Sequence, residues 1–176
     1  MATPTLDATP AGAAANSYTT VSEADAYHDS RLHRDAWLAT GADAATKTVA
    51  LIMATRTMDA LFEWAAWPTT TTQVLQWPRN AVPRRGGLTY VGSMEIPPEL
   101  KNATAELARL LIAEDRTADS DIETNKLRAL KAGPVELVFG DGVTAKPIAD
   151  LVAALLPPEW GYVRNRYRLT RELIPT

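Results

Sequence analysis

The stretch ADAATKTVALIMATRTMDALF, residues 42–62, decides the fold class of this chain. It holds helix-forming residues without proline or glycine, and Asp43 is a suitable N-cap because its carboxylate can accept a backbone N–H of the first turn. Its large apolar side chains fall on more than one face of a helix, whereas a surface helix carries a single apolar stripe. We therefore expect a central helix that other elements surround.

The partner of this helix is predicted at IPPELKNATAELARLLIAEDR, residues 96–116. Pro97 and Pro98 stand at its start, where the first helical turn favours proline. A helix over about 98–115 collects the following apolar residues on one face: Leu100, Ala103, Leu107, Leu110 and Leu111. Such a stripe needs an apolar surface to pack on, and the helix at 42–62 supplies one.

Shorter signals place the remaining helices. Thr20 and Glu23 form a capping box at the start of a helix near 21–32. Pro147 begins a last short helix, which the pair Pro157-Pro158 ends because proline cannot continue a helix. Together with the two long helices, these segments predict a mainly α protein.

Two further segments are predicted to be non-helical. Residues 64–92 place three tryptophans between prolines and two adjacent glycines, which predicts a long loop anchored by aromatic side chains, with or without a short hairpin. Residues from about 124 to 140 contain Val135, Leu137 and Phe139 in alternation, with Gly133-Pro134 as a turn, which is typical of a β-hairpin.

The predicted architecture is a small helical bundle with a projecting β-hairpin and extended N- and C-terminal tails. Residues 1–16 are rich in Ala, Thr and Pro with one large apolar side chain, so we expect a flexible tail. Residues 17–160 form the domain, and residues 161–176 form an extended arm.

Composition limits the function classes. A chain of 176 residues with 46% apolar content can bury one good core, and the absence of cysteine excludes disulfides and thiolate chemistry. The start lacks the pattern of a secretory signal, and no apolar run approaches the roughly 18 residues of a membrane span. We expect a soluble protein that is not exported and does not contact a membrane.

Charge is distributed unevenly along the chain. Residues 161–176 hold four arginines against Glu172, which gives this segment a charge of +3. Because the net charge of the chain is −3, residues 1–160 carry −6. An acidic body repels polyanions at long range, which argues against a nucleic-acid surface over the main domain. The basic arm is the exception.

No pattern of residues predicts an enzyme, a cofactor or a metal site. His28 and His33 are five residues apart and would point about 140° apart on a helix, so they cannot share an ion. The carboxylates between Glu114 and Glu123 lack the spacing of a calcium-binding loop. Glycine-rich phosphate loops and nucleophile motifs are also missing from the sequence.

A tryptophan beside arginines raises the possibility of a single-strand site. Trp77 lies close in sequence to Arg79, Arg84 and Arg85, and an aromatic platform with a basic rim can hold single-stranded nucleic acid. In the alternative interpretation, which we favour, Trp77 fills the core and the arginines keep a loop tip soluble.

The C-terminal arm has the period of a strand. Arg164, Arg166 and Arg168 alternate with other side chains in YVRNRYRLTRELIPT, residues 162–176. An extended segment of this kind can add to another protein's sheet or lie in its groove. We therefore expect the arm to dock on a separate polypeptide.

Five motifs resemble those of a known family. In chain order they are NSYTTVSEADAYHDSR, ATRTMDALFEWAAW, LQWPRNAV, IPPELKNATAELARLLI and KAGPVELVF, and they span roughly residues 16–140. They resemble tailed-phage proteins described as a DnaT-like single-stranded-DNA-binding family, and proteins of this kind look like head-tail adaptors.

This resemblance implies a structural virion protein, a head-tail adaptor or connector that forms a ring, expected to be dodecameric. Its partners would be the portal protein, a tail-terminator or neck protein below, and double-stranded DNA that passes without specific binding. It would be assembled in the host bacterial cytoplasm and lie in the neck of the virion. The implied portal-binding residues are Tyr162, Arg164, Arg166, Tyr167, Arg168 and Arg171. The implied contacts with neighbouring subunits or the tail are Trp64, Trp67, Trp77, Arg79, Arg84, Arg85, Val135, Leu137 and Phe139.

The alternative function is a single-stranded-DNA-binding module of phage replication. The positions of the arginines distinguish the two hypotheses. A continuous groove that joins the arm to the loop at Arg79–Arg85 and is lined by tryptophans would favour DNA binding.

Overall fold

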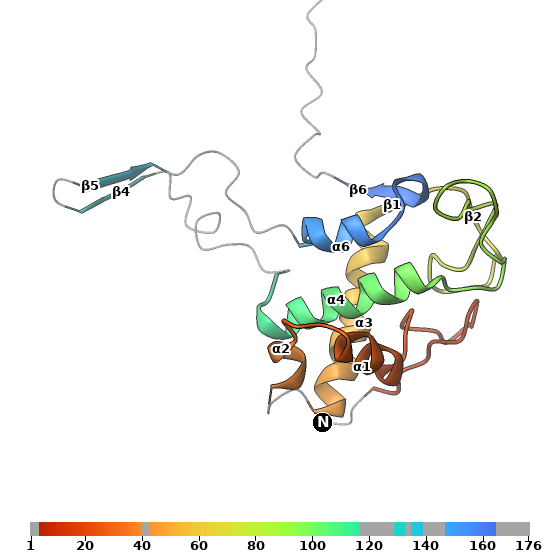
Figure 1. Ribbon diagram of the computed structural model, residues 1–176, viewed down its shortest axis with the longest axis horizontal. Coiled ribbons are helices and arrows are strands. Elements are labelled where there is room, and N and C mark those ends of the chain that lie inside the picture. Colours follow the sequence, from red (N-terminus) through yellow and green to blue (C-terminus); the bar gives the residue numbers. More distant parts are fainter. Residues whose placement is uncertain (1–3, 40–42, 117–128, 133–134, 139–146, 165–176) are drawn as a thin grey trace, which may run out of the picture.

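The computed structural model describes residues 4–39, 43–116, 129–132, 135–138 and 147–164, and for 129–132 and 135–138 it describes the backbone alone. The helices are α1 (Val21–Asp29), α2 (Asp35–Leu38), α3 (Ala44–Leu61), α4 (Pro98–Ala113) and α6 (Asp150–Leu155), with a 3₁₀ turn, η1 (Pro158–Trp160). Figure 1 shows the mainly α architecture, which confirms the predicted fold class. No helix in the described ranges has the length and apolar character needed to cross a membrane.

The long helices begin where local signals predict them. Asp43 caps α3 by accepting the Thr46 N–H at 2.7 Å. The capping box of α1 is complete, since Thr20 Oγ1 accepts the Glu23 N–H and the Glu23 carboxylate accepts the Thr20 N–H at 2.9 Å. These caps satisfy N–H groups that a helix start leaves without intrahelical partners.

The core lies between α3 and α4, as the apolar stripes predict. The two helices pack against each other, and α1 and α6 contact α4 on other sides (Figure 1). Leu51 and Met58 of α3 and Leu100 and Leu107 of α4 are fully buried. Aromatic side chains complete the core: Tyr18, Trp37, Phe62, Trp64, Trp77 and Trp160.

Three two-stranded antiparallel ribbons accompany the helices in the described ranges. β4 (Ala129–Ala132) pairs with β5 (Val135–Val138), which confirms the predicted hairpin. β1 (Phe62–Trp64) pairs with β6 (Gly161–Val163), and β2 (Trp67–Pro68) pairs with β3 (Arg79–Asn80). β2 and β3 lie within the predicted loop, β1 lies at its start, and β6 lies at the start of the predicted arm.

Both termini differ from the sequence expectation in their described parts. Asn16 Oδ1 accepts the Asp7 N–H at 2.8 Å, Asn16 N–H donates to the Asp7 carbonyl at 2.8 Å, and Ala15 is buried. Residues 4–16 therefore form a loop that is closed by hydrogen bonds, which a composition argument based on apolar content does not consider. The expected domain boundary after residue 160 falls at the β1–β6 ribbon, because residues 161–163 are a strand of the domain.

Candidate functional site

Two of the tryptophans proposed for an interface lie in the interior. Trp64 is almost fully buried and Trp77 is 1% exposed. The Trp77 ring meets Trp64 edge-on, with centroids 5.7 Å apart, and packs against Trp160 at 5.0 Å. Trp77 therefore fills the core, which is the interpretation that the sequence favoured. Neither ring has a face open to a base.

Arg79 is also an interior residue and not part of a basic rim. Its side chain points into the domain, and the residue is 5% exposed. Its guanidinium donates to the carbonyls of Ala65 at 2.8 Å, Ala66 at 2.6 Å and Gln76 at 3.0 Å. We call this set the Arg79 clamp. A buried guanidinium needs such acceptors, because its charge cannot be left without partners.

The Arg79 clamp fixes a tight turn that presents Trp67 to solvent. Ala66 has a φ of +61°, in the left-handed region that alanine rarely adopts, and its carbonyl is an acceptor of the clamp. The next residue, Trp67, is 59% exposed, in contrast to the other tryptophans. Trp67 begins β2, whose register pairs it with Asn80. The hydrogen bonds of the buried Arg79 therefore hold the turn that directs this indole to solvent.

A partly buried carboxylate supports the same loop. Asp59 of α3 accepts hydrogen bonds from the Tyr18 hydroxyl and from the backbone N–H of Gln76 at 3.2 Å. Burial raises the pKa of Asp59 to about 6, against the opposing effect of these hydrogen bonds and of the Arg79 charge. Asp59 thus ties α3 to the segment before α1 and to the loop that contains Trp77.

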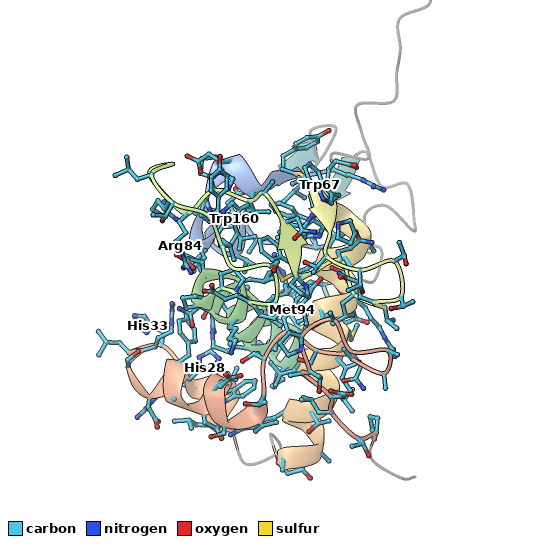
Figure 2. The ribbon with its side chains drawn as sticks, turned by 90° about the vertical axis from the view of Figure 1, so that its right-hand side faces the viewer. His28, His33, Trp67, Arg84, Met94 and Trp160 are labelled. Atoms are coloured by element: carbon cyan, nitrogen blue, oxygen red, sulfur yellow. The ribbon has the colours of Figure 1, made fainter. Side chains whose placement is uncertain are left out.

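The remaining arginines of the loop do not gather with Trp77. Arg84 forms an ion pair with Glu95, with its Nη2 at 2.6 Å and 2.8 Å from the two carboxylate oxygens. Arg85 is exposed and donates to the Leu155 carbonyl at 3.4 Å. Figure 2 shows Arg84 on the opposite side of the domain from Trp67. The continuous groove that would have joined these arginines to the tryptophans is not formed by the described residues.

Aromatic and basic side chains do meet solvent on the β1–β6 ribbon. Tyr162 of β6 is 66% exposed and stands opposite Glu63 of β1. Arg164 follows the strand, and its backbone N–H donates to the Leu61 carbonyl at 2.7 Å. Its side-chain Nε lies 2.5 Å from Glu63 Oε2.

Trp67 and the β1–β6 ribbon belong to the same end of the domain. Figure 1 shows β1, β2 and β6 together there, and Figure 2 places Trp67 at that end, far from His28 and His33. We call Trp67, Tyr162, Arg164 and Glu63 the ribbon end. Gly161 allows this ribbon to close, since a Cβ there would lie 2.0 Å from the Glu63 carbonyl oxygen and its φ is +141°.

The two histidines do not form a site. His28 is buried on α1, with Nε2 3.2 Å from the Ala105 carbonyl oxygen and its ring against Trp37. His33 is exposed and does not take part in the contacts of His28. In the described part of the chain no cluster of three metal-binding side chains occurs.

Several predicted site residues have side chains outside the part of the chain that the structure describes. Arg166, Tyr167, Arg168, Arg171 and Phe139 lie outside the described residues. Val135 and Leu137 belong to β5, of which only the backbone is described.

Glu63 was missed by the sequence analysis. A single glutamate between aromatic residues has no pattern that distinguishes it from a solvated surface charge, and its arginine partner is 101 residues away.

Comparison with known proteins identifies a family and corrects the functional interpretation. Neither the curated proteins nor the solved structures gave a match. A family model matches residues 6–171, almost the whole chain, and its description refers to single-stranded-DNA binding. The label suggested by the five motifs is therefore right, but the head-tail adaptor role that we attached to it is wrong, because the matched family is not an adaptor family. The portal, the neck protein and the ring were implied by that role, and the family description mentions none of them. The chain belongs to the family described as "Putative DnaT-like ssDNA binding protein".

Proposed function

We propose that this protein binds single-stranded DNA at the ribbon end, with Trp67 and Tyr162 as stacking platforms and Arg164 as a phosphate contact. The observation that supports this most directly is the exposure of Trp67 above the buried Arg79 clamp. The fold buries the other four tryptophans, so an exposed indole on a fixed turn is unlike the rest of the set. Indole rings stack on any base, which suits binding without sequence preference.

Charge supports the same location. Arg164 leads directly into residues 165–176, whose sequence adds three arginines and one glutamate. The acidic character of residues 1–160 opposes DNA over the body of the domain, so it restricts binding to the end that the basic segment follows. Because phosphate contacts release counterions, the affinity should fall as the salt concentration rises.

The family description supports the ligand class. Its match extends over residues 6–171 and therefore includes every member of the ribbon end. Single-strand binders of this type combine aromatic platforms with a basic groove for the backbone. This is the second of the two hypotheses that the sequence raised, moved from the Trp77 loop to the ribbon end.

Fluorescence anisotropy of a labelled 30-nucleotide oligothymidylate, titrated with the full chain at low and at moderate salt, tests the proposal. Trp67→Ala should weaken binding by about 5- to 150-fold, because stacking contributes on the order of 1–3 kcal/mol for each base. Tyr90→Ala is the matched control, since Tyr90 is 66% exposed but belongs to the loop after Arg84.

Three outcomes would contradict the proposal. Absence of binding by the unmodified chain at low salt would reject the function. Equal affinities of the unmodified chain and Trp67→Ala would reject the ribbon end as the site. Stronger binding to the duplex of the same length would show that the single strand is not the preferred ligand.

A further inference from the structure

Arg164 is held in place from two directions. Its backbone N–H donates to the Leu61 carbonyl, which extends the β1–β6 ribbon by one residue. Its guanidinium Nε is 2.5 Å from Glu63 Oε2, with 57% of the arginine side chain and 47% of the glutamate side chain exposed. The cation that the ribbon end offers to DNA is therefore already paired with an anion of the same protein.

The partner of Arg164 presents the same chemistry as a DNA phosphate. Carboxylate and phosphate both offer anionic oxygens that accept guanidinium N–H groups in charge-assisted hydrogen bonds. Glu63 also lies directly across the ribbon from Tyr162, so its charge faces the surface on which a nucleotide would stack. A phosphate that approaches Arg164 must displace this carboxylate or share the guanidinium with it.

The ion pair is weak enough to be displaced. Exposed pairs of this type contribute little, with a median of about 0–1 kcal/mol, because water and salt screen them. Arg164 has five N–H donors, and the recorded contact with Glu63 uses the one on Nε. Exchange of one anion for another at this guanidinium does not require any change in the fold.

We infer that Glu63 is an affinity-setting residue that occupies Arg164 in the free protein and competes with the phosphates of single-stranded DNA. This inference depends on the proposed function and adds a regulatory residue to its site. Glu63 lowers the affinity for any polyanion and restricts binding to ligands that also stack on Trp67 and Tyr162. Selectivity for single strands then comes from an opposing charge as well as from attraction.

The test is a double-mutant cycle on oligothymidylate binding. Glu63→Gln keeps the size of the side chain and removes its charge, so binding should become roughly two- to fivefold tighter, which corresponds to the upper half of the range for an exposed pair. The slope of log affinity against log salt should steepen by up to about 0.7, the value for one fully neutralised phosphate on a single strand, because no carboxylate then offsets the charge of Arg164. In an Arg164→Ala background the same substitution should have a much smaller effect, because the competition acts through Arg164.

Glu159→Gln is the matched control for general charge. Glu159 is exposed, stands two residues before β6, and makes no ion pair with any residue of the described ranges. Its substitution should change affinity by less than twofold, and by the same factor with or without Arg164. Far-ultraviolet circular dichroism and a urea melt confirm that each variant is folded.

The two hypotheses fail in different ways. If the unmodified chain does not bind the oligonucleotide, the proposed function fails and this inference fails with it. If the unmodified chain binds and Glu63→Gln matches Glu159→Gln, DNA binding stands and the role of Glu63 is rejected. An equal gain from Glu63→Gln in both Arg164 backgrounds would also reject it, since general repulsion would then explain the gain.

Discussion

Substitution of Arg79 by methionine separates the two interpretations of this residue. The sequence places Arg79 on a solvated loop or at an interface, where removal of the charge would change the free energy of unfolding by less than about 0.5 kcal/mol. The structure buries it, with three backbone carbonyls as acceptors at 2.6–3.0 Å. Methionine retains most of the apolar stem and removes every donor.

The expected cost is about 3–5 kcal/mol. Loss of one partner from a buried charged network leaves the others without compensation, and this range is typical of such losses. Two contributions add here: the carbonyls of Ala65, Ala66 and Gln76 lose their donors, and the partly buried Asp59 loses a nearby positive charge that favours its ionised form.

Urea unfolding at pH 7, followed by circular dichroism at 222 nm, measures this cost. Arg85→Met is the control because Arg85 is exposed in the same loop and has one long contact, 3.4 Å, to the Leu155 carbonyl. The control should unfold within about 0.5 kcal/mol of the unmodified chain. A cost below about 1 kcal/mol for Arg79→Met would show that the clamp does not hold the turn, and the account of Trp67 presentation would have to be abandoned.

Three further predictions concern the core, the ribbon and pH. Leu107→Ala should lower the free energy of unfolding by about 2–5 kcal/mol, because Leu107 is fully buried, and a loss below about 0.5 kcal/mol in a urea melt would contradict the assigned core. Gly161→Ala should lower the thermal midpoint by several degrees, roughly 2–8 °C per kcal/mol of strain, since its Cβ would lie 2.0 Å from the Glu63 carbonyl oxygen; an unchanged midpoint would refute the close approach. The free energy of unfolding should depend on pH through Asp59, whose folded pKa of about 6 lies above its unfolded value. The stability that its proton provides is complete below about pH 4 and is lost as pH rises through 6, a change on the order of 2–3 kcal/mol that Asp59→Asn should abolish.

The control for the pH prediction is the difference between the unfolding free energies of the unmodified chain and of Asp59→Asn at each pH. Burial lowers the pKa of His28, which contributes stability that is lost as pH falls, so its effect opposes that of Asp59 over a similar range. Both proteins contain His28, and subtraction of the two stability curves removes its contribution. A flat difference between pH 4.5 and 7.5 would contradict the raised pKa of Asp59.

The helices could be predicted because their signals are local. Asp43 caps α3 within four residues, and the capping box of Thr20 and Glu23 acts within the first turn of α1. The stripe that includes Leu107 repeats at helical spacing, and the alternation of Val135 and Leu137 predicted the strand β5 of the hairpin. Each of these patterns is complete within a few consecutive residues, so the sequence displays it directly.

The candidate site could not be located by the same reasoning. Trp64 and Trp67 are three residues apart in a similar context, yet one is interior and the other is exposed. The difference arises because β1 pairs with β6, a strand almost 100 residues later, and because Arg79 clamps the turn between the two tryptophans. Strands of two or three residues are also too short to show an alternating pattern.

The sequence by itself determined the mainly α fold, the central helix pair and the basic character of the C-terminal segment, because caps, apolar periodicity and charge can be read from neighbouring residues. Only the tertiary structure decided that Arg79 is interior, that Trp67 and Tyr162 face solvent at one end, and that Glu63 pairs with Arg164. Those outcomes depend on contacts between segments far apart in the chain. Burial in such contacts is a property of the assembled packing, which no local pattern of residues encodes.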